Sequence, residues 1–271
     1  MNAPFTVVLC EGYHDRAFLH GALISALGWI DPGDHRGGRR PFDDRWGQVG
    51  GGAFGFRKQP GDAAIRVKPC QGHTEILPAA ARILKDRLIR PFDRLVLCFD
   101  GDKGGTGADY LENIHRAVAT MVTQLGINAV QVAPGRWRLN QEWIEVCTLV
   151  WHVPGTTREG VPPQQCLERL VCSAAAEVWP ERSKEIDRWL SEPDRSSSFS
   201  GTPGLTPKSY SWSWMGAWFA EHGCDAFYQV MWTQPLLARA LMRHLDATGA
   251  WSTLEACVRA SDDLKPAIGA P

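Results

Sequence analysis

The first half of the chain alternates short apolar segments with longer amphipathic ones. The short segments carry Val, Leu and Ile, as strands buried in a parallel sheet do, and cover residues 6–10, 64–69, 94–99 and 128–133. The longer segments repeat apolar side chains every three or four positions, as helices do, and cover residues 14–28, 73–89 and 107–125. This alternation predicts right-handed βαβ units and an α/β fold with a mostly parallel, Rossmann-like central sheet flanked by helices.

The second half adds one strand and two helical segments, at residues 143–153, 162–190 and 235–248. The added strand is a candidate to pair with residues 135–139. We therefore expect two parts. Residues 1–160 would form an α/β core, and residues 161–271 would form a helical part that packs on the core and completes the functional site.

Residues 31–62 interrupt the alternation. They are rich in Gly, Asp, Arg and Pro, so we expect an insertion with some hairpin character that contributes no core element. Basic residues alternate with aromatic ones in and near it, a combination that suits single-stranded or distorted nucleic acid. The candidate nucleic-acid-binding residues are Arg39, Arg40, Arg57, Lys58 and, further along the chain, Lys103. The alternative is a solvated loop with no such role.

Aromatic side chains are concentrated in the helical C-terminal part of the chain. They are Trp212, Trp214, Trp218, Phe219, Phe227, Tyr228 and Trp232. So much aromatic surface at helical spacing is typical of a core or of a partner interface, such as a homodimer contact, rather than of a ligand cage. We therefore expect a helical, Trp-rich C-terminal extension that packs on the core.

Composition narrows the class of protein. The formal net charge of -1 gives no global attraction to polyanions, so nucleic-acid contacts would have to come from a local basic patch or through metal ions. No apolar stretch is long enough to cross a bilayer, and the N-terminus lacks the features of a signal peptide, so we expect a cytoplasmic protein without a membrane partner. Cys10, Cys98 and Cys147 fall inside apolar segments, where we expect buried thiols rather than zinc ligands.

Carboxylates follow two of the predicted strands. Glu11 comes directly after the first strand, and Asp15 lies at the start of the next helix; Asp100 and Asp102 follow the strand at residues 94–99. Because the carboxyl ends of parallel strands meet at one edge of a sheet, we expect these four acids to converge. Their hard oxygen ligands suit Mg²⁺ or Mn²⁺. Taken alone, Asp15 also fits a helix cap, and Asp100 and Asp102 also fit an ordinary turn.

The two acidic motifs resemble those of the Toprim domain, which is shared by topoisomerases, bacterial primases and the OLD-type (overcoming lysogenization defect) nucleases. The matching segments are residues 7–15 and 95–102. The spacing from Glu11 to Asp15 looks more like the OLD-type branch. Topoisomerases tend to carry a third acid in the later motif, where this chain has Gly104, and the chain has no room for a second domain with a nucleophilic Tyr.

The resemblance implies a nuclease or phosphodiesterase that hydrolyses nucleic acid by a two-metal mechanism. Glu11, Asp15, Asp100 and Asp102 would hold the metals, although Glu11 is also a candidate general acid or base. In OLD-type relatives a further Glu and a Lys come from the helices that follow the core. Glu168 stands where the metal-binding Glu would be, and Lys208 matches the Lys that stabilises the transition state. The alternatives are a surface Glu168 paired with Arg on its own helix and a solvated Lys208.

Two other functions stay open. One is a Toprim nucleic-acid-binding or regulatory subunit of a defence or repair complex, with little activity of its own. The other is a different doubly wound domain with one Mg²⁺, such as a receiver or phosphatase-like fold, although its further motifs are not found. OLD-type nucleases usually carry an ATPase on the same chain. No Gly-x-x-x-x-Gly-Lys-Ser/Thr string occurs here, so the protein would act alone or with a separately encoded ATPase or phage-defence partner.

Overall fold

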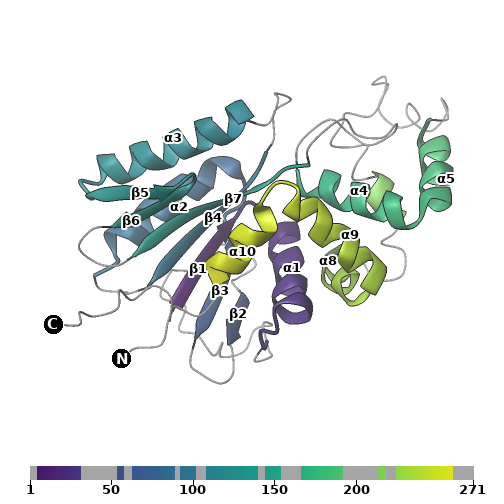
Figure 1. Ribbon diagram of the computed structural model, residues 1–271, viewed down its shortest axis with the longest axis horizontal. Coiled ribbons are helices and arrows are strands. Elements are labelled where there is room, and N and C mark those ends of the chain that lie inside the picture. The colour runs from purple at the N-terminus through teal and green to yellow at the C-terminus, as the bar shows by residue number, and fades with distance from the viewer. Residues whose placement is uncertain are drawn as a thin grey trace.

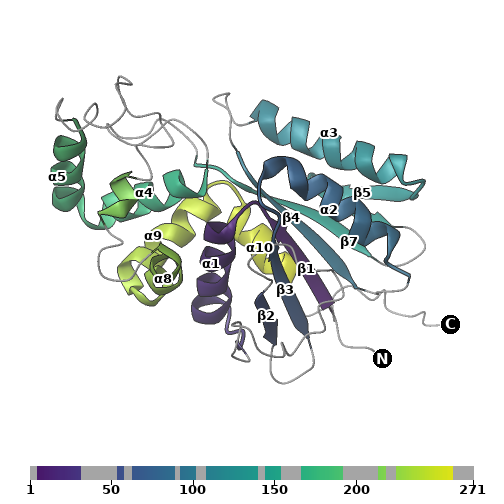
Figure 2. The same ribbon diagram turned by 180° about the vertical axis from the view of Figure 1, so that it is seen from behind.

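The protein is described from a computed structural model. It describes residues 5–31, 54–57, 63–88, 92–101, 108–139, 144–153, 166–191, 213–217 and 224–258. In this part of the chain a seven-stranded sheet is covered by helices on both faces (Figures 1 and 2). The predicted α/β fold is therefore confirmed.

The sheet is parallel at its centre and antiparallel at its two flanks. In their order across the sheet the strands are β2 (Phe54–Arg57), β3 (Ala64–Pro69), β1 (Phe5–Cys10), β4 (Arg94–Asp100), β7 (Glu145–Trp151), β6 (Arg136–Leu139) and β5 (Ala129–Ala133). The four strands from β3 to β7 pair in parallel, whereas β2, β6 and β5 each pair antiparallel to the neighbour on their inner side. The parallel strands place their carboxyl ends along one edge.

Two strands differ from the sequence-based expectation. The strand predicted at residues 128–133 forms, but as β5 at the outer edge of the sheet, and β7 takes the place beside β4. In keeping with these places, β7 is buried along its whole length, as an internal strand is, while most of β5 is exposed. The insertion at residues 31–62 was expected to contribute no core element, which is wrong for residues 54–57: they form β2, and Phe56 is fully buried.

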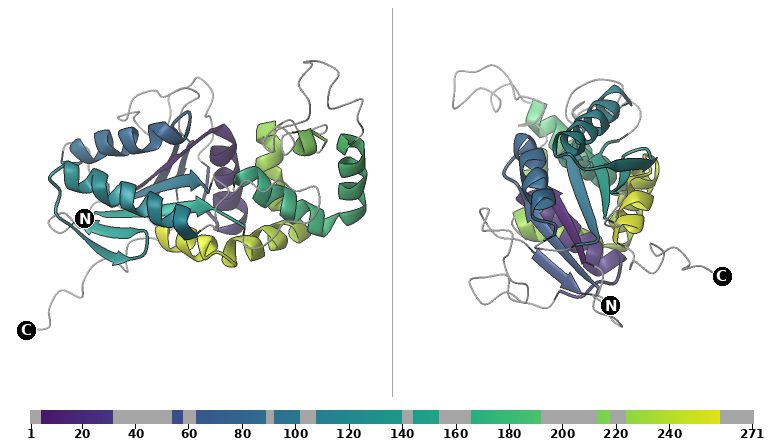
Figure 3. Two further views of the ribbon diagram at one scale, coloured as in Figure 1. Left: turned by 90° about the horizontal axis from the view of Figure 1, so that it is seen from above. Right: turned by 90° about the vertical axis from the view of Figure 1, so that its left-hand side faces the viewer.

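The helices divide between the two faces of the sheet. They are α1 (Tyr13–Gly21, continued by a π-helical turn, Ala22–Ala26), α2 (His73–Lys85), α3 (Ala108–Gln124), α4 (Leu167–Val178), α5 (Pro180–Ser191), α8 (Cys224–Val230), α9 (Pro235–Asp246) and α10 (Ala250–Val258). Helices α2 and α3 cover one face, and α1 and α10 cover the other (Figure 3). The helix expected over residues 162–190 is interrupted at Trp179, and α5 begins at Pro180, a residue that favours the first turn of a helix. No helix among the described residues is long and apolar enough to cross a membrane.

The C-terminal helices share a hydrophobic core with the sheet. Trp214, Tyr228 and Trp232 are buried in one cluster with Val8 and Val96 of the central strands, as expected for core aromatics. The seven cysteines whose side chains the structure describes are buried and form no disulfide with one another.

Helix α1 packs closely against the C-terminal helices. A Cβ atom on Gly21 would lie 2.5 Å from Cδ1 of Trp232, so only glycine allows this approach.

A buried ion pair holds the edge of the sheet opposite the carboxyl ends. Glu145 is fully buried at the start of β7 and accepts hydrogen bonds from Nε of Arg94, at 3.1 Å, and from Nε of Arg136, at 2.8 Å. Nη1 of Arg94 also donates to the carbonyl oxygen of Cys257, at 2.5 Å. The network therefore joins three strands to helix α10.

Candidate functional site

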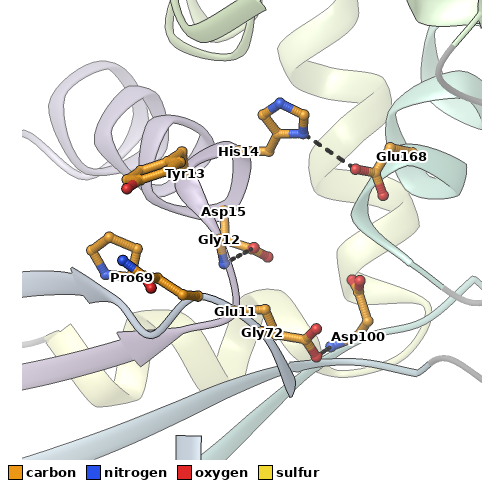
Figure 4. Close-up of a pocket in the computed structure, with 10 residues that line it drawn as sticks. Glu11, Gly12, Tyr13, His14, Asp15, Pro69, Gly72, Asp100 and Glu168 are labelled. Carbon is orange, nitrogen blue, oxygen red and sulfur yellow. Dashed lines mark hydrogen bonds and ion pairs between the residues drawn. The ribbon is translucent and has the colours of Figure 1, made fainter. Parts of the chain in front are cut away.

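The carboxyl ends of β1, β3 and β4 border a pocket of about 510 Å³. It is lined by Glu11, Gly12, Tyr13, His14, Asp15, Pro69, Gln71, Gly72, Asp100 and Glu168 (Figure 4). Four of the five predicted metal ligands therefore line one pocket. They come from three separate stretches of the chain, because Glu11 and Asp15 frame the start of α1, Asp100 ends β4 and Glu168 lies in the first turn of α4.

Glu11 is held at the end of β1 by its neighbours. Its Oε1 atom accepts the backbone N–H of Asp100, at 2.8 Å, and a hydrogen bond from Nδ1 of His73, at 2.9 Å. The carbonyl oxygen of Glu11 accepts the backbone N–H of Gly72, at 2.8 Å. Glu11 is thus bonded to β4, through Asp100, and to the segment that follows β3, through Gly72 and His73.

Asp15 has both carboxylate oxygens engaged. Oδ1 accepts the indole N–H of Trp151, at 2.6 Å, and Oδ2 accepts the backbone N–H of Gly12, at 3.0 Å. Asp15 therefore caps α1 and lines the pocket at once. It is only 6% exposed, and burial, followed by the negative charge of Glu168, raises its pKa to about 7.

Asp100 and Glu168 face the same pocket with opposite pKa shifts. Asp100 accepts the backbone N–H of Leu167 at Oδ1, at 3.0 Å, and burial, with the charges of Asp15 and Glu168, raises its pKa well above the usual value. Burial would also raise the pKa of Glu168, but hydrogen bonds, led by that of His14, bring it below its usual value. Nδ1 of His14 lies 3.3 Å from Oε1 of Glu168. Since Glu168 is buried, the alternative of a surface residue is wrong.

Three helices begin at this pocket. Gly12 precedes α1, Gly72 precedes α2, and Cys166 precedes α4, whose first backbone N–H donates to Asp100. Helix N-termini carry partial positive charge and unpaired N–H groups, which favour anions. They offset part of the repulsion among the four carboxylates and would also favour a phosphate group.

The chemistry of the pocket fits a divalent cation such as Mg²⁺ or Mn²⁺. Its ligand candidates are carboxylate oxygens, which these hard cations prefer. Burial, and after it the charges of the neighbouring carboxylates, raises the pKa values of Asp15 and Asp100, and a bound cation would offset that repulsion. The described side chains, however, include no group of three His, Cys, Asp or Glu already arranged around one metal position.

Several predicted site residues lie outside the described part of the chain. They are Arg39, Arg40, Lys58, Asp102, Lys103 and Lys208. Arg57 ends β2, and only its backbone is described. The proposed roles of these seven residues stay predictions.

Sequence reasoning missed four residues at or beside the pocket: His14, His73, Tyr110 and Trp151. A signal for two of them existed. His73 follows the carboxyl end of β3, and Trp151 ends β7, so the rule that led to Glu11 and Asp100 would have identified both had it been applied to every parallel strand. His14 lies inside the acidic motif itself. Tyr110, on α3, has no such signal in the sequence.

Comparisons with known proteins add information on the fold. No family model matches the chain, and no curated protein matches its sequence. Among solved structures, the fold is similar to the crystal structure of a hypothetical protein from Pyrococcus horikoshii OT3, with a TM-score of 0.63 and 15% sequence identity. The match covers 94% of this chain and 99% of that chain, so it includes the C-terminal helices as well as the sheet.

Proposed function

We propose that this chain is a metal-dependent nuclease or phosphodiesterase of the Toprim type, nearest to the OLD-type branch. The observation that carries the proposal is the convergence of Glu11, Asp15, Asp100 and Glu168 in one pocket at the carboxyl edge of a parallel sheet. The first three come from the acidic motifs that resemble Toprim, and Glu168 comes from the helix after the core, as in OLD-type relatives. Mg²⁺ or Mn²⁺ bound there would supply an activated water and offset the charge that develops on the phosphate.

The residues of the chain prepare this pocket in distinct ways. Trp151 and Gly12 hold both oxygens of Asp15, and Leu167 holds one oxygen of Asp100. Carboxylates held in this way need little reorganisation when a cation binds, which is the basis of electrostatic preorganisation. The resemblance to OLD-type nucleases alone makes Lys208 the candidate for stabilising charge in the transition state.

Substrate would reach the pocket past an exposed aromatic side chain. Tyr13 lines the pocket and is 40% exposed, and the guanidinium carbon of Arg16 lies 5.0 Å from the centroid of its ring. Aromatic side chains beside a phosphate-binding region are typical of sites for single-stranded nucleic acid, whose bases are available for stacking. This agrees with nucleic acid, DNA or RNA, as the substrate.

Incubation of the purified protein with plasmid, linear DNA and RNA, with Mg²⁺, Mn²⁺ or EDTA, tests the proposal. Asp100→Asn is the sharpest variant, since asparagine keeps an oxygen for the N–H of Leu167 but removes the charge. We expect metal-dependent cleavage by the wild type and a loss of about a hundredfold or more in this variant. Lys208→Ala tests, in the same assay, whether Lys208 contributes to cleavage. Glu112→Gln, on the exposed face of α3, is the matched control and should keep full activity.

A second function, the nucleic-acid-binding or regulatory subunit with little activity, is favoured by one observation. The described acids form no ready group of three metal ligands, and each is already bonded to a donor of the protein. Nucleic-acid binding without cleavage of any substrate, in the presence of either metal, would identify this function. Metal-dependent cleavage that Asp100→Asn leaves unchanged would contradict the proposed site.

A further inference from the structure

A line of hydrogen bonds leads from Glu11 out of the acidic pocket. Oε1 of Glu11 lies 2.9 Å from Nδ1 of His73, and Nε2 of His73 lies 3.4 Å from the hydroxyl oxygen of Tyr110. Oε1 of Glu11 already accepts the backbone N–H of Asp100, so we take it as the acceptor for His73 as well, which places the donated proton on Nδ1. In the neutral ring Nε2 is then an acceptor, and the hydroxyl of Tyr110 donates to it.

These bonds leave the two oxygens of Glu11 in different surroundings. Oε1 accepts from both His73 and the backbone N–H of Asp100. In the described part of the chain, hydrogen bonds to the Glu11 side chain reach Oε1 alone. Figure 4 shows the carboxylate beside Asp100, with one of its oxygens bonded to the Asp100 backbone. Oε2 is thus the oxygen available to a ligand in the pocket.

The backbone before His73 is shaped to place it there. Gln71 has φ +68° and Gly72 has φ +131°, and Gln71 is the non-glycine residue with positive φ among those described. Such conformations cost energy and persist where surrounding contacts hold them. Here the N–H of Gly72 bonds to the carbonyl oxygen of Glu11, so the same turn holds Glu11 through its main chain and, by way of His73, through its side chain.

We propose that His73 is a positioning residue for Glu11, which holds Oε1 so that Oε2 is presented to the metal ion and substrate. This inference rests on the proposed function and adds to it a residue that neither acidic motif contains. Hydrogen bonds to the ligands of a metal ion orient them, and their loss typically lowers metal affinity by about ten- to a hundredfold. Tyr110 supports the orientation of His73 from α3.

The test compares four variants by Mn²⁺ affinity and by cleavage kinetics. His73→Ala removes the donor, whereas His73→Asn keeps an N–H near the position of Nδ1. Tyr110→Phe removes only the outer hydroxyl, and Thr74→Ala, at the exposed neighbouring position, is the matched control. Mn²⁺ affinity is measured by equilibrium binding. The constants kcat and KM are measured on a cleaved substrate, and Tm shows that each variant is folded.

We expect His73→Ala to lower Mn²⁺ affinity and kcat by about tenfold or more, with KM nearly unchanged. His73→Asn should recover both to within about threefold of the wild type, Tyr110→Phe should show a smaller loss, and Thr74→Ala should show none. If His73 had only a structural role, the N–H that asparagine shares with histidine would not restore Mn²⁺ affinity or kcat. Equal values for the alanine, asparagine and wild-type proteins, or equal losses in both His73 variants, would overturn the proposal.

The two proposals fail in different ways. If the wild type binds Mn²⁺ but cleaves nothing, the nuclease proposal fails, while the order of Mn²⁺ affinities among the His73 variants still decides the positioning role. If cleavage occurs and His73→Ala changes neither affinity nor kcat, the positioning role fails and the nuclease stands. A wild type that binds no Mn²⁺ overturns both.

Discussion

The indole N–H of Trp151 donates a 2.6 Å hydrogen bond to Oδ1 of Asp15, so the end of β7 is tied to the first turn of α1. The two residues come from opposite ends of the α/β core in sequence, and both are almost completely buried. The bond gives a buried carboxylate a partner and holds it at the pocket. It therefore contributes to stability and to the site together.

Trp151→Phe should destabilise the protein. The variant keeps an aromatic ring in the core but leaves Oδ1 of Asp15 without its donor. At pH 8, where Asp15 is ionised, a hydrogen bond to a charged group contributes about 1.5–3 kcal/mol. Urea unfolding followed by circular dichroism measures the change in the free energy of unfolding. Trp189→Phe, at an exposed position of α5, should change it by less than about 0.5 kcal/mol. Equal effects of the two substitutions would show that the bond to Asp15 contributes nothing.

Stability should depend on pH through Asp15. Its pKa is raised from 3.8 to about 7 by burial and by Glu168, so between about pH 4 and pH 7 the folded protein holds a proton that the unfolded chain has lost. The contribution of Asp15 to stability is therefore full below about pH 4 and falls as pH rises to about 7.

Comparison with Asp15→Asn isolates this contribution. His115, His152 and His244 have pKa values lowered by burial, and they shift the total stability in the opposite direction. In metal-free buffer, the free energy of unfolding of the wild type relative to Asp15→Asn should fall from pH 5 to pH 8. Mg²⁺ or Mn²⁺ at pH 8 should restore it, because a ligand that binds only the folded state stabilises that state. A difference that rises with pH would contradict the assignment.

Glu145→Gln should be among the most destabilising single substitutions. It removes the negative charge that pairs with Arg94 in a buried position, and breaking a buried ion pair costs about 3–5 kcal/mol. Glu112→Gln, which breaks an exposed pair with Arg116, should cost less than about 0.5 kcal/mol. Denaturant unfolding measures both. Because Glu145 lies at the edge opposite the pocket, any Glu145→Gln protein that remains folded should keep its affinity for Mn²⁺.

Tyr13→Ala should weaken binding of single-stranded substrate. Stacking of a base on an aromatic ring contributes about 1–3 kcal/mol, so we expect KM for a single-stranded oligonucleotide to rise about tenfold, with a smaller change for duplex of the same sequence. Tyr13→Phe keeps the ring and should behave as the wild type. Equal increases for both substrates would indicate that Tyr13 does not contact bases.

The sequence predicted best what depends on neighbours along the chain. Glu11 and Asp100 could be identified because each lies at the end of an apolar strand. Glu168 was identified only through the resemblance to OLD-type relatives.

The order of strands could not be predicted in the same way. Both β5 and β7 contain two Val residues, whereas the internal place of β7 involves contacts with helices distant in sequence, such as α10. The contacts of Glu11 with His73 and of Asp15 with Trp151 join residues 62 and 136 positions apart; the strand-end rule brings these segments to one edge of the sheet but does not predict which side chains bond.

The same contacts bear on how the protein folds. His14 meets Glu168 across 154 residues of chain, and Trp151 meets Asp15 across 136. Pairings over such long separations form slowly, because the chain entropy lost in closing the loop precedes the energy gained. Pairing of β1 with β4 brings Glu11 beside Asp100 over a shorter separation of 89 residues. We therefore expect Glu11 and Asp100 to meet early in folding. We expect helix α4, which carries Glu168, to pack against the sheet among the last events.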